Sequence, residues 1–233
     1  MVTSVRLVAL AGLGLLAACT RPVDDPLAVN SIYGGLAPMP VYRGELPQVL
    51  FSAPDTPDRQ SLLYTAMVEA EVASQYAGRA LAAGDPTLVR SALGEVLYAL
   101  DPGAAPDWEA KSIGIVRGWA GTGYGLQRAA AGMADEIRAA AAAGDASAPL
   151  TDYGLPAARC ADNALERAER LVLLSREAVA AAAPQSEPLL RQIQDLAIQL
   201  NQGAGPVAGA AADPECGLEQ AVRYLAPLSP RRS

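Results

Sequence analysis

Apolar side chains recur every three or four residues through most of the chain beyond residue 56. Strand-like runs of β-branched residues are nearly absent. Proline and glycine interrupt the helical pattern at a few places and divide it into separate helices. We therefore predict an all-α fold, an antiparallel bundle of five or six helices over residues 56–227. The expected helices cover residues 57–83, 86–100, 107–143, 156–183, 187–202 and 214–226, with loops at 145–155 and 203–212.

The residues at several expected helix ends have side chains that favour those positions. Thr56 is a suitable N-cap, and Pro57 suits the first helical position. Gly84 suits a C-terminal cap, and Asp85-Pro86 would begin the next helix. Asp101-Pro102-Gly103 would end that helix. These local signals predict a pair of helices joined by a sharp turn.

The expected helix over residues 107–143 is unusual because it contains many glycines. Each interior glycine costs about 1 kcal/mol of helix propensity relative to alanine. Close approach by a neighbouring helix would offset this cost, and we favour that interpretation. Two alternatives stay open: a break in the helix near residues 121–125, or a pocket left open for a ligand. The candidate helix-packing glycines are Gly114, Gly118, Gly121, Gly125 and Gly132.

The segment of residues 19–55 is rich in proline, which keeps it out of helical structure. It is expected to be an extended leader, and residues 228–233 a flexible tail. Residues 38–54 are expected to pack on the bundle because they contain an apolar cluster. The members of that cluster are Val41, Tyr42, Leu46, Val49, Leu50 and Phe51.

The first 18 residues have the layout of a secretory signal peptide. Arg6 precedes an apolar run from Leu7 to Leu16, which is too short to span a bilayer. The run ends in Leu16-Ala17-Ala18-Cys19, which resembles the lipobox of the bacterial lipoprotein family. The resemblance covers only residues 1–20.

The lipoprotein resemblance implies cleavage before Cys19 and attachment of acyl chains to Cys19. Several acyl chains anchor a protein to a membrane stably. In that family an Asp after the cysteine favours the inner membrane, so Thr20 favours the outer membrane. The expected location is the cell envelope, anchored by lipid and facing the periplasm. An ordinary secreted protein with a chance cysteine is the alternative.

The two other cysteines, Cys160 and Cys216, are expected to form a disulfide, because the cell envelope is oxidising. The bridge would join the first turns of the fourth and sixth expected helices. Closing a loop of this length is worth roughly 4 kcal/mol in the chain-entropy model. A redox pair or a metal site is the alternative, although there is no Cys-x-x-Cys motif and no histidine.

Charge and composition exclude several classes of function. The formal net charge is −7, and removal of residues 1–18 would make it one unit more negative. This charge argues against nucleic acid and anionic lipid as partners. The absence of histidine removes the commonest general base and excludes di-iron and c-type haem sites of the usual kind.

We expect no enzymatic activity, no catalytic residues, no metal ligands and no cofactor. Helical lipoproteins that cleave murein have a catalytic glutamate, typically followed by serine, and no Glu-Ser dipeptide occurs in this chain. Three glutamates on expected helices are candidates for buried acids, but helical carboxylates are usually solvated. They are Glu95, Glu109 and Glu136.

The favoured hypothesis is a non-enzymatic interaction or scaffold protein of the cell envelope, with an envelope protein as its partner. A bundle that binds a small ligand or a metal is the alternative, and an envelope enzyme that uses carboxylates is the least favoured hypothesis. Candidates for a polar or soft lining of such a site are Tyr64, Met67, Glu71, Tyr98 and Met133. Methionine and tyrosine at helical spacing are more often part of the apolar core.

Overall fold

The computed structural model describes residues 45–104, 121–181, 187–204 and 215–229. These ranges are helical and contain no strand, so the predicted all-α bundle is confirmed. Within them, no helix is both long and apolar enough to cross a membrane. The longer helices are α3 (Leu62–Ala82), α4 (Pro86–Leu100), α6 (Leu126–Ala141), α7 (Leu155–Ala180), α8 (Glu187–Gln202) and α9 (Leu218–Leu225). The short ones are α2 (Pro47–Leu50), η1 (Pro57–Arg59), η2 (Pro102–Ala104), η3 (Leu150–Gly154) and η5 (Ala226–Leu228).

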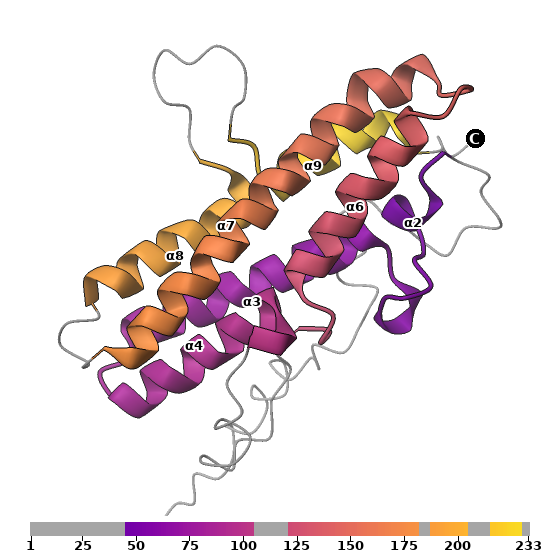
Figure 1. Cartoon of the computed structure of the whole chain (residues 1–233). Helices are drawn as coiled ribbons and strands as arrows, with labels where there is room; N and C mark the ends of the chain where they lie inside the picture. The colour runs from indigo at the N-terminus through magenta and orange to yellow at the C-terminus, as the bar shows by residue number, and fades with distance from the viewer. Residues whose placement is uncertain (1–44, 105–120, 182–186, 205–214, 230–233) are drawn as a thin grey trace, which may run out of the picture. The chain divides into compact units, whose positions relative to one another are not determined.

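Helices α3 and α7 are the centre of the bundle. Each of them packs against α4, α6, α8 and α9 (Figure 1). Both present rows of fully buried alanines, which let neighbouring helices approach closely, and the neighbours supply the larger side chains of the core. The buried alanines are Ala66, Ala70, Ala73, Ala77 and Ala80 on α3 and Ala157, Ala161, Ala164 and Ala168 on α7. The larger side chains include Leu93, Leu97, Leu126, Met133, Ile137, Ile193 and Leu200.

Helices α4 and α8 begin and end where the sequence predicts. The Asp85 carboxylate accepts hydrogen bonds from the backbone N–H of Thr87 at 2.7 Å and of Leu88 at 3.3 Å. These bonds cap α4 and lower the pKa of Asp85. Helix α8 covers the predicted range of 187–202.

The predicted start of the first helix at Thr56-Pro57 is wrong. The Thr56 hydroxyl donates to the carbonyls of Ala53 at 2.8 Å and Gln60 at 2.5 Å, so it closes a turn instead of capping a helix. Pro57 opens only η1, and α3 begins at Leu62 with Ser61 as its N-cap. Helix α3 ends at Ala82 with Ala83 as its C-cap, so Gly84 lies at the predicted end, but it lacks the positive φ angle of a capping glycine.

The predicted helix over 107–143 is also wrong at residues 121–125, which are not helical. Gly121, Gly123 and Gly125 have φ angles of 70°, 73° and 85°, and α6 begins only at Leu126. The continuous helix is therefore excluded at residues 121–125, as the alternative of a break expected, whereas residues 105–120 lie outside the described residues. Gly114, Gly118 and Glu109 lie outside the described residues, as do Cys19 and the signal peptide.

Two further boundaries differ from the prediction. Part of the expected loop at 145–155 is the π-helical turn η3, which leads directly into α7. Cys216 does not lie in the first turn of the last helix, because α9 begins two residues later at Leu218 with Gly217 as its N-cap. Asp213-Pro214 lies outside the described residues.

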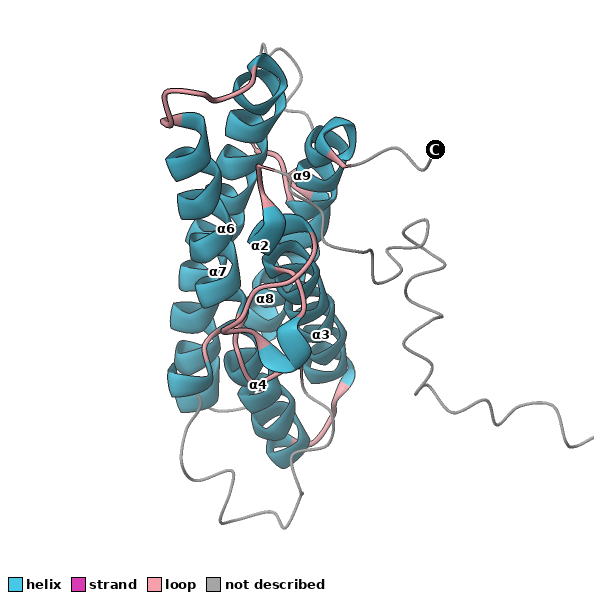
Figure 2. Ribbon diagram, turned by 90° about the vertical axis from the view of Figure 1, so that its right-hand side faces the viewer, coloured by secondary structure: helices cyan, strands magenta, loops and turns pink. Residues whose placement is uncertain are grey.

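Residues 45–55, which we call the docking strap, belong to the folded bundle. Helix α2 lies in the strap and packs against α3 and α6 (Figure 2). Leu46, Val49, Leu50 and Ala53 are buried in the common core. The prediction that residues 38–54 pack on the bundle is confirmed for the described part, 45–54. The expectation that proline keeps residues 19–55 out of helical structure is wrong at Pro47–Leu50, because a proline at the first helical position loses no hydrogen bond.

Candidate functional site

The glycine-rich loop of residues 121–125 encloses the carboxylate of Glu69, a residue of α3 that is fully buried. The backbone N–H and the hydroxyl of Thr122 each donate to Glu69 Oε1 at 2.5 Å. A Cβ atom on Gly121 would lie 1.8 Å from Glu69 Oε2. A Cβ on Gly123 would lie 2.7 Å from the Tyr98 hydroxyl. The loop therefore fits directly onto side chains of α3 and α4.

This contact corrects the role predicted for two of the glycines. Gly121 and Gly125 do not pack one helix against another, because neither lies in a helix. They provide the positive φ angles and the close backbone approach that the loop requires. Gly132 does lie in α6, where its missing side chain leaves a Cβ position 3.5 Å from both δ carbons of Leu62.

Burial raises the pKa of Glu69. The hydrogen bonds from the hydroxyl and backbone of Thr122, and from the backbone of Gly125 and Gly123, act in the opposite direction but do not cancel it. Glu69 is 0% exposed, so its carboxyl group is closed to solvent. The hydrogen bonds that it accepts from Thr122 hold the loop in place.

The residues considered for a ligand lining do not form a common site. Met67 and Met133 are part of the apolar core. Glu71 accepts a hydrogen bond from Gln75 at 2.9 Å in an exposed position. Tyr98 lies at the glycine-rich loop, and Tyr64 is only partly buried. Within the described residues no group of three histidine, cysteine or acidic side chains could hold a metal ion.

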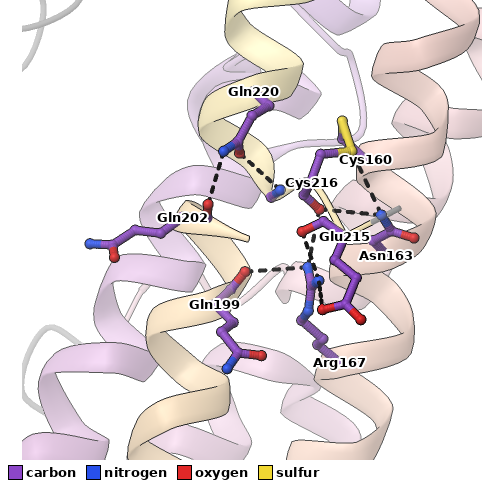
Figure 3. A network of polar contacts seen from close by, with 9 residues as sticks. Cys160, Asn163, Arg167, Gln199, Gln202, Glu215, Cys216 and Gln220 are labelled. Atoms are coloured by element: carbon purple, nitrogen blue, oxygen red, sulfur yellow. Dashed lines mark hydrogen bonds and ion pairs between the residues drawn. A yellow bond between two sulfur atoms is a disulfide. The ribbon is translucent and has the colours of Figure 1, made fainter. Parts of the chain in front are cut away.

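The predicted disulfide between Cys160 and Cys216 is present and joins α7 to the segment before α9. Arg167 reinforces the same junction (Figure 3). Its guanidinium donates to the carbonyls of Gln199 at 3.3 Å, Glu215 at 2.9 Å and Cys216 at 3.1 Å. The pKa of Arg167 lies below its ordinary value because burial lowers it, and the nearby carboxylate of Glu215 offsets only part of that effect. This polar network fastens the end of α8 and the start of α9 to α7.

An open cleft lies between the docking strap and α6, with a volume of about 360 Å³. Its carboxylates are Asp55 from the strap and Asp135 and Glu136 from α6. We call it the acidic cleft. It is lined by Gln48, Ala53, Asp55, Leu62, Tyr124, Gly132, Asp135, Glu136 and Ala139.

Guanidinium groups already interact with the surroundings of the acidic cleft. Arg128 stacks over the Tyr124 ring, with its guanidinium carbon 4.4 Å from the ring centre. Arg138 forms an ion pair with Asp162 and approaches Asp135 at 3.9 Å. The described part of the chain contains no ion pair of Asp55 or Glu136. The cleft therefore keeps two carboxylates that can accept hydrogen bonds from a cationic group.

Comparison of the chain with family models, with curated proteins and with solved structures gave no significant match. The site must therefore be interpreted from its own residues.

Sequence reasoning named only two residues of the acidic cleft, Glu136 and Gly132, and assigned neither to a cleft. Asp55 and Asp135 carried no local signal, because isolated acidic residues on a surface are common. The expected packing of residues 38–54 on the bundle was the one sequence feature that could have located this site.

Proposed function

We propose that this protein is a non-enzymatic interaction protein of the cell envelope, lipid-anchored through Cys19 and facing the periplasm. It binds a basic segment of an envelope protein in the acidic cleft. The observation that carries the proposal is the combination of a 360 Å³ cleft with the carboxylates of Asp55 and Glu136, which have no ion-pair partner among the described residues.

The chemistry of the cleft fits an arginine side chain. A carboxylate binds a guanidinium group through two parallel hydrogen bonds, and Asp55 and Glu136 each offer such a carboxylate. The formal net charge of −7 would also speed the encounter with a basic partner at low salt.

A small organic cation is the second candidate, since the cleft volume lies within the range of small-molecule sites, about 300–1,000 Å³. In that case the cleft would serve a ligand-binding bundle, the alternative that the sequence left open. Competition between a basic peptide and a polyamine separates the two candidates.

The test is titration of the Cys19→Ala form with an acetylated, amidated tetra-arginine peptide, followed by calorimetry. The matched control peptide is tetra-citrulline, which keeps the shape of arginine and removes the charge. The double variant Asp55→Asn, Glu136→Gln is expected to weaken binding about tenfold, which corresponds to about 1.4 kcal/mol. Glu169→Gln, Glu177→Gln is the control variant, because both carboxylates are exposed on α7 and lie outside the cleft lining.

Equal weakening in the two double variants would show that only the overall charge matters and would contradict the proposed site. Equal binding of tetra-citrulline would exclude recognition of a cation. Tight binding of spermidine that displaces tetra-arginine would favour the small organic cation.

A further inference from the structure

We propose that the docking strap is a removable wall of the acidic cleft, so that docking of the strap and occupation of the cleft stabilise each other. This inference rests on the proposed function, because it concerns the regulation of the same site.

The acidic cleft is composed of two separate parts of the chain. Gln48, Ala53 and Asp55 come from the strap, whereas the other lining residues come from α3, α6 and the residue Tyr124 just before α6. If the strap left the bundle, the cleft would lose one wall. It would also lose the carboxylate of Asp55, which is one of the two cleft carboxylates that have no ion-pair partner among the described residues. A ligand of the cleft therefore binds the docked state of the strap.

A polar contact at the surface holds the first residue of the strap. The Glu45 carboxylate accepts hydrogen bonds from the Ser147 N–H at 3.0 Å and from the Ser147 hydroxyl at 2.7 Å. The same hydroxyl accepts from the N–H of Leu150 at 3.2 Å, which is the first residue of η3. Glu45 and Ser147 are 102 residues apart in the sequence, so this contact exists only while the strap is docked.

The other end of the strap is a strained turn. Thr56 closes it, and the next residues include Asp58 and Arg59, which both have a φ angle of 54°. This region is one that residues other than glycine rarely adopt. Release of the strap would return conformational freedom to its residues, whereas burial of Leu46, Val49 and Leu50 opposes release. The docked state therefore depends on a balance that a ligand can shift.

The position of the strap gives this balance a consequence for the whole protein. The strap is the part of the leader that joins the bundle, and the lipid anchor is expected at Cys19. Undocking of its 11 residues would lengthen the tether by up to about 36 Å, at roughly 3.3 Å per residue. Occupation of the acidic cleft would thus keep the bundle closer to the membrane.

The test combines hydrogen exchange with binding, in the Cys19→Ala form. The reporters are the amides of Leu50, Phe51 and Ala53, which bond to the carbonyls of Leu46, Pro47 and Gln60 within the strap region. Saturating tetra-arginine should slow exchange of these amides at least threefold. Glu45→Ala should speed their exchange, both in the free protein and in the presence of tetra-arginine. Glu45→Gln, which keeps an oxygen acceptor, should have a smaller effect in both measurements.

The matched control is Glu169→Ala, which removes an exposed carboxylate from α7 and should change neither measurement. Unchanged exchange in α3 and α7 would show that each variant is folded. If tetra-arginine fails to bind, or binds without dependence on Asp55 and Glu136, the proposed function and this inference both fall.

If binding depends on the two acidic residues but tetra-arginine leaves strap exchange unchanged, the inference alone is overturned. The same holds if tetra-arginine fails to slow the faster strap exchange of Glu45→Ala. In both cases the strap is a fixed wall and the binding function stands.

Discussion

At the scale of single residues, the contact between Gly121 and Glu69 is the most demanding in the described structure. The glycine combines a φ angle of 70° with a Cβ position only 1.8 Å from a buried carboxylate oxygen. The nearest atoms are the two carboxylate oxygens and Cδ of Glu69, which could make room only by giving up the hydrogen bonds from Thr122. A side chain at residue 121 therefore conflicts with both the backbone and its surroundings.

We expect Gly121→Ala to lower the free energy of unfolding by about 3 kcal/mol or more, through left-handed strain and steric overlap. Urea-induced unfolding measures this change. Gly84→Ala is the control, because a Cβ atom there meets nothing within 4 Å, and it should stay within about 0.5 kcal/mol of the wild type. Equal effects of the two substitutions would contradict the described loop.

Glu69 gives the same junction a dependence on pH. Because burial raises its pKa, the folded state binds more protons than the unfolded state at pH values between 4.5 and the folded pKa. Stability contributed by this group is therefore present at low pH and is lost as pH rises through that window. Above the folded pKa the loss is complete and constant.

We expect the stability of Glu69→Gln, measured relative to the wild type, to increase from pH 4 to pH 7. The other titrating groups are common to both proteins and cancel in the difference. Urea unfolding at several pH values provides the measurement. A difference that does not change with pH would mean that Glu69 has an ordinary pKa in the folded protein.

At the scale of elements, the disulfide and Arg167 join three helices at one place. Cys160 and Cys216 connect α7 to α9, and the guanidinium of Arg167 bonds to the last turn of α8. Helix α9 has only 8 residues, which is too short to be stable alone. Its position therefore depends on this junction and on burial of Leu218 and Leu225.

Replacement of both bridged cysteines by alanine should lower the free energy of unfolding by roughly 4 kcal/mol, because the bridge closes a long loop in the unfolded chain. Thermal and urea unfolding measure the loss. Reductant should bring the wild type to the stability of the double variant and leave the variant unchanged. Equal stability of oxidised wild type and double variant would refute the expected contribution.

At the scale of the whole molecule, the expected lipid anchor and the acidic cleft connect location with binding. In our proposal the anchor would confine the protein to a membrane surface, where the effective concentration of an envelope partner would be high. A modest affinity in the cleft would then be sufficient for association. The strap, which lies between the anchor and the bundle in the sequence, is placed to couple the two.

Cys19→Ala should abolish labelling with radioactive palmitate and release the protein from the membrane fraction. The reason is that the thiol of Cys19 is the expected site of acylation. The double replacement of Cys160 and Cys216 by alanine is the control and should remain labelled. Persistent labelling of Cys19→Ala would contradict the lipoprotein assignment.

Local signals in the sequence were sufficient where one helix end depends on its own neighbours. Asp85-Pro86 predicted the start of α4 because an aspartate caps through the next three residues. Cys160 and Cys216 were the expected pair because only two cysteines remain beside Cys19. The helical spacing of apolar residues likewise predicted the all-α class.

Only the tertiary structure decided the features that depend on distant residues. Thr56 has a side chain that often caps helices, but its hydroxyl donates to the carbonyls of Ala53 and Gln60 instead. The chain leaves the helical path at 121–125 because Glu69, about 50 residues earlier, accepts the hydrogen bonds of Thr122. The acidic cleft exists because the strap and α6 meet, and no local pattern encodes that meeting. The sequence by itself thus determined the all-α class and the ends of α4 and α8, whereas long-range packing decided the course of the chain at residues 121–125 and the cleft between the strap and α6.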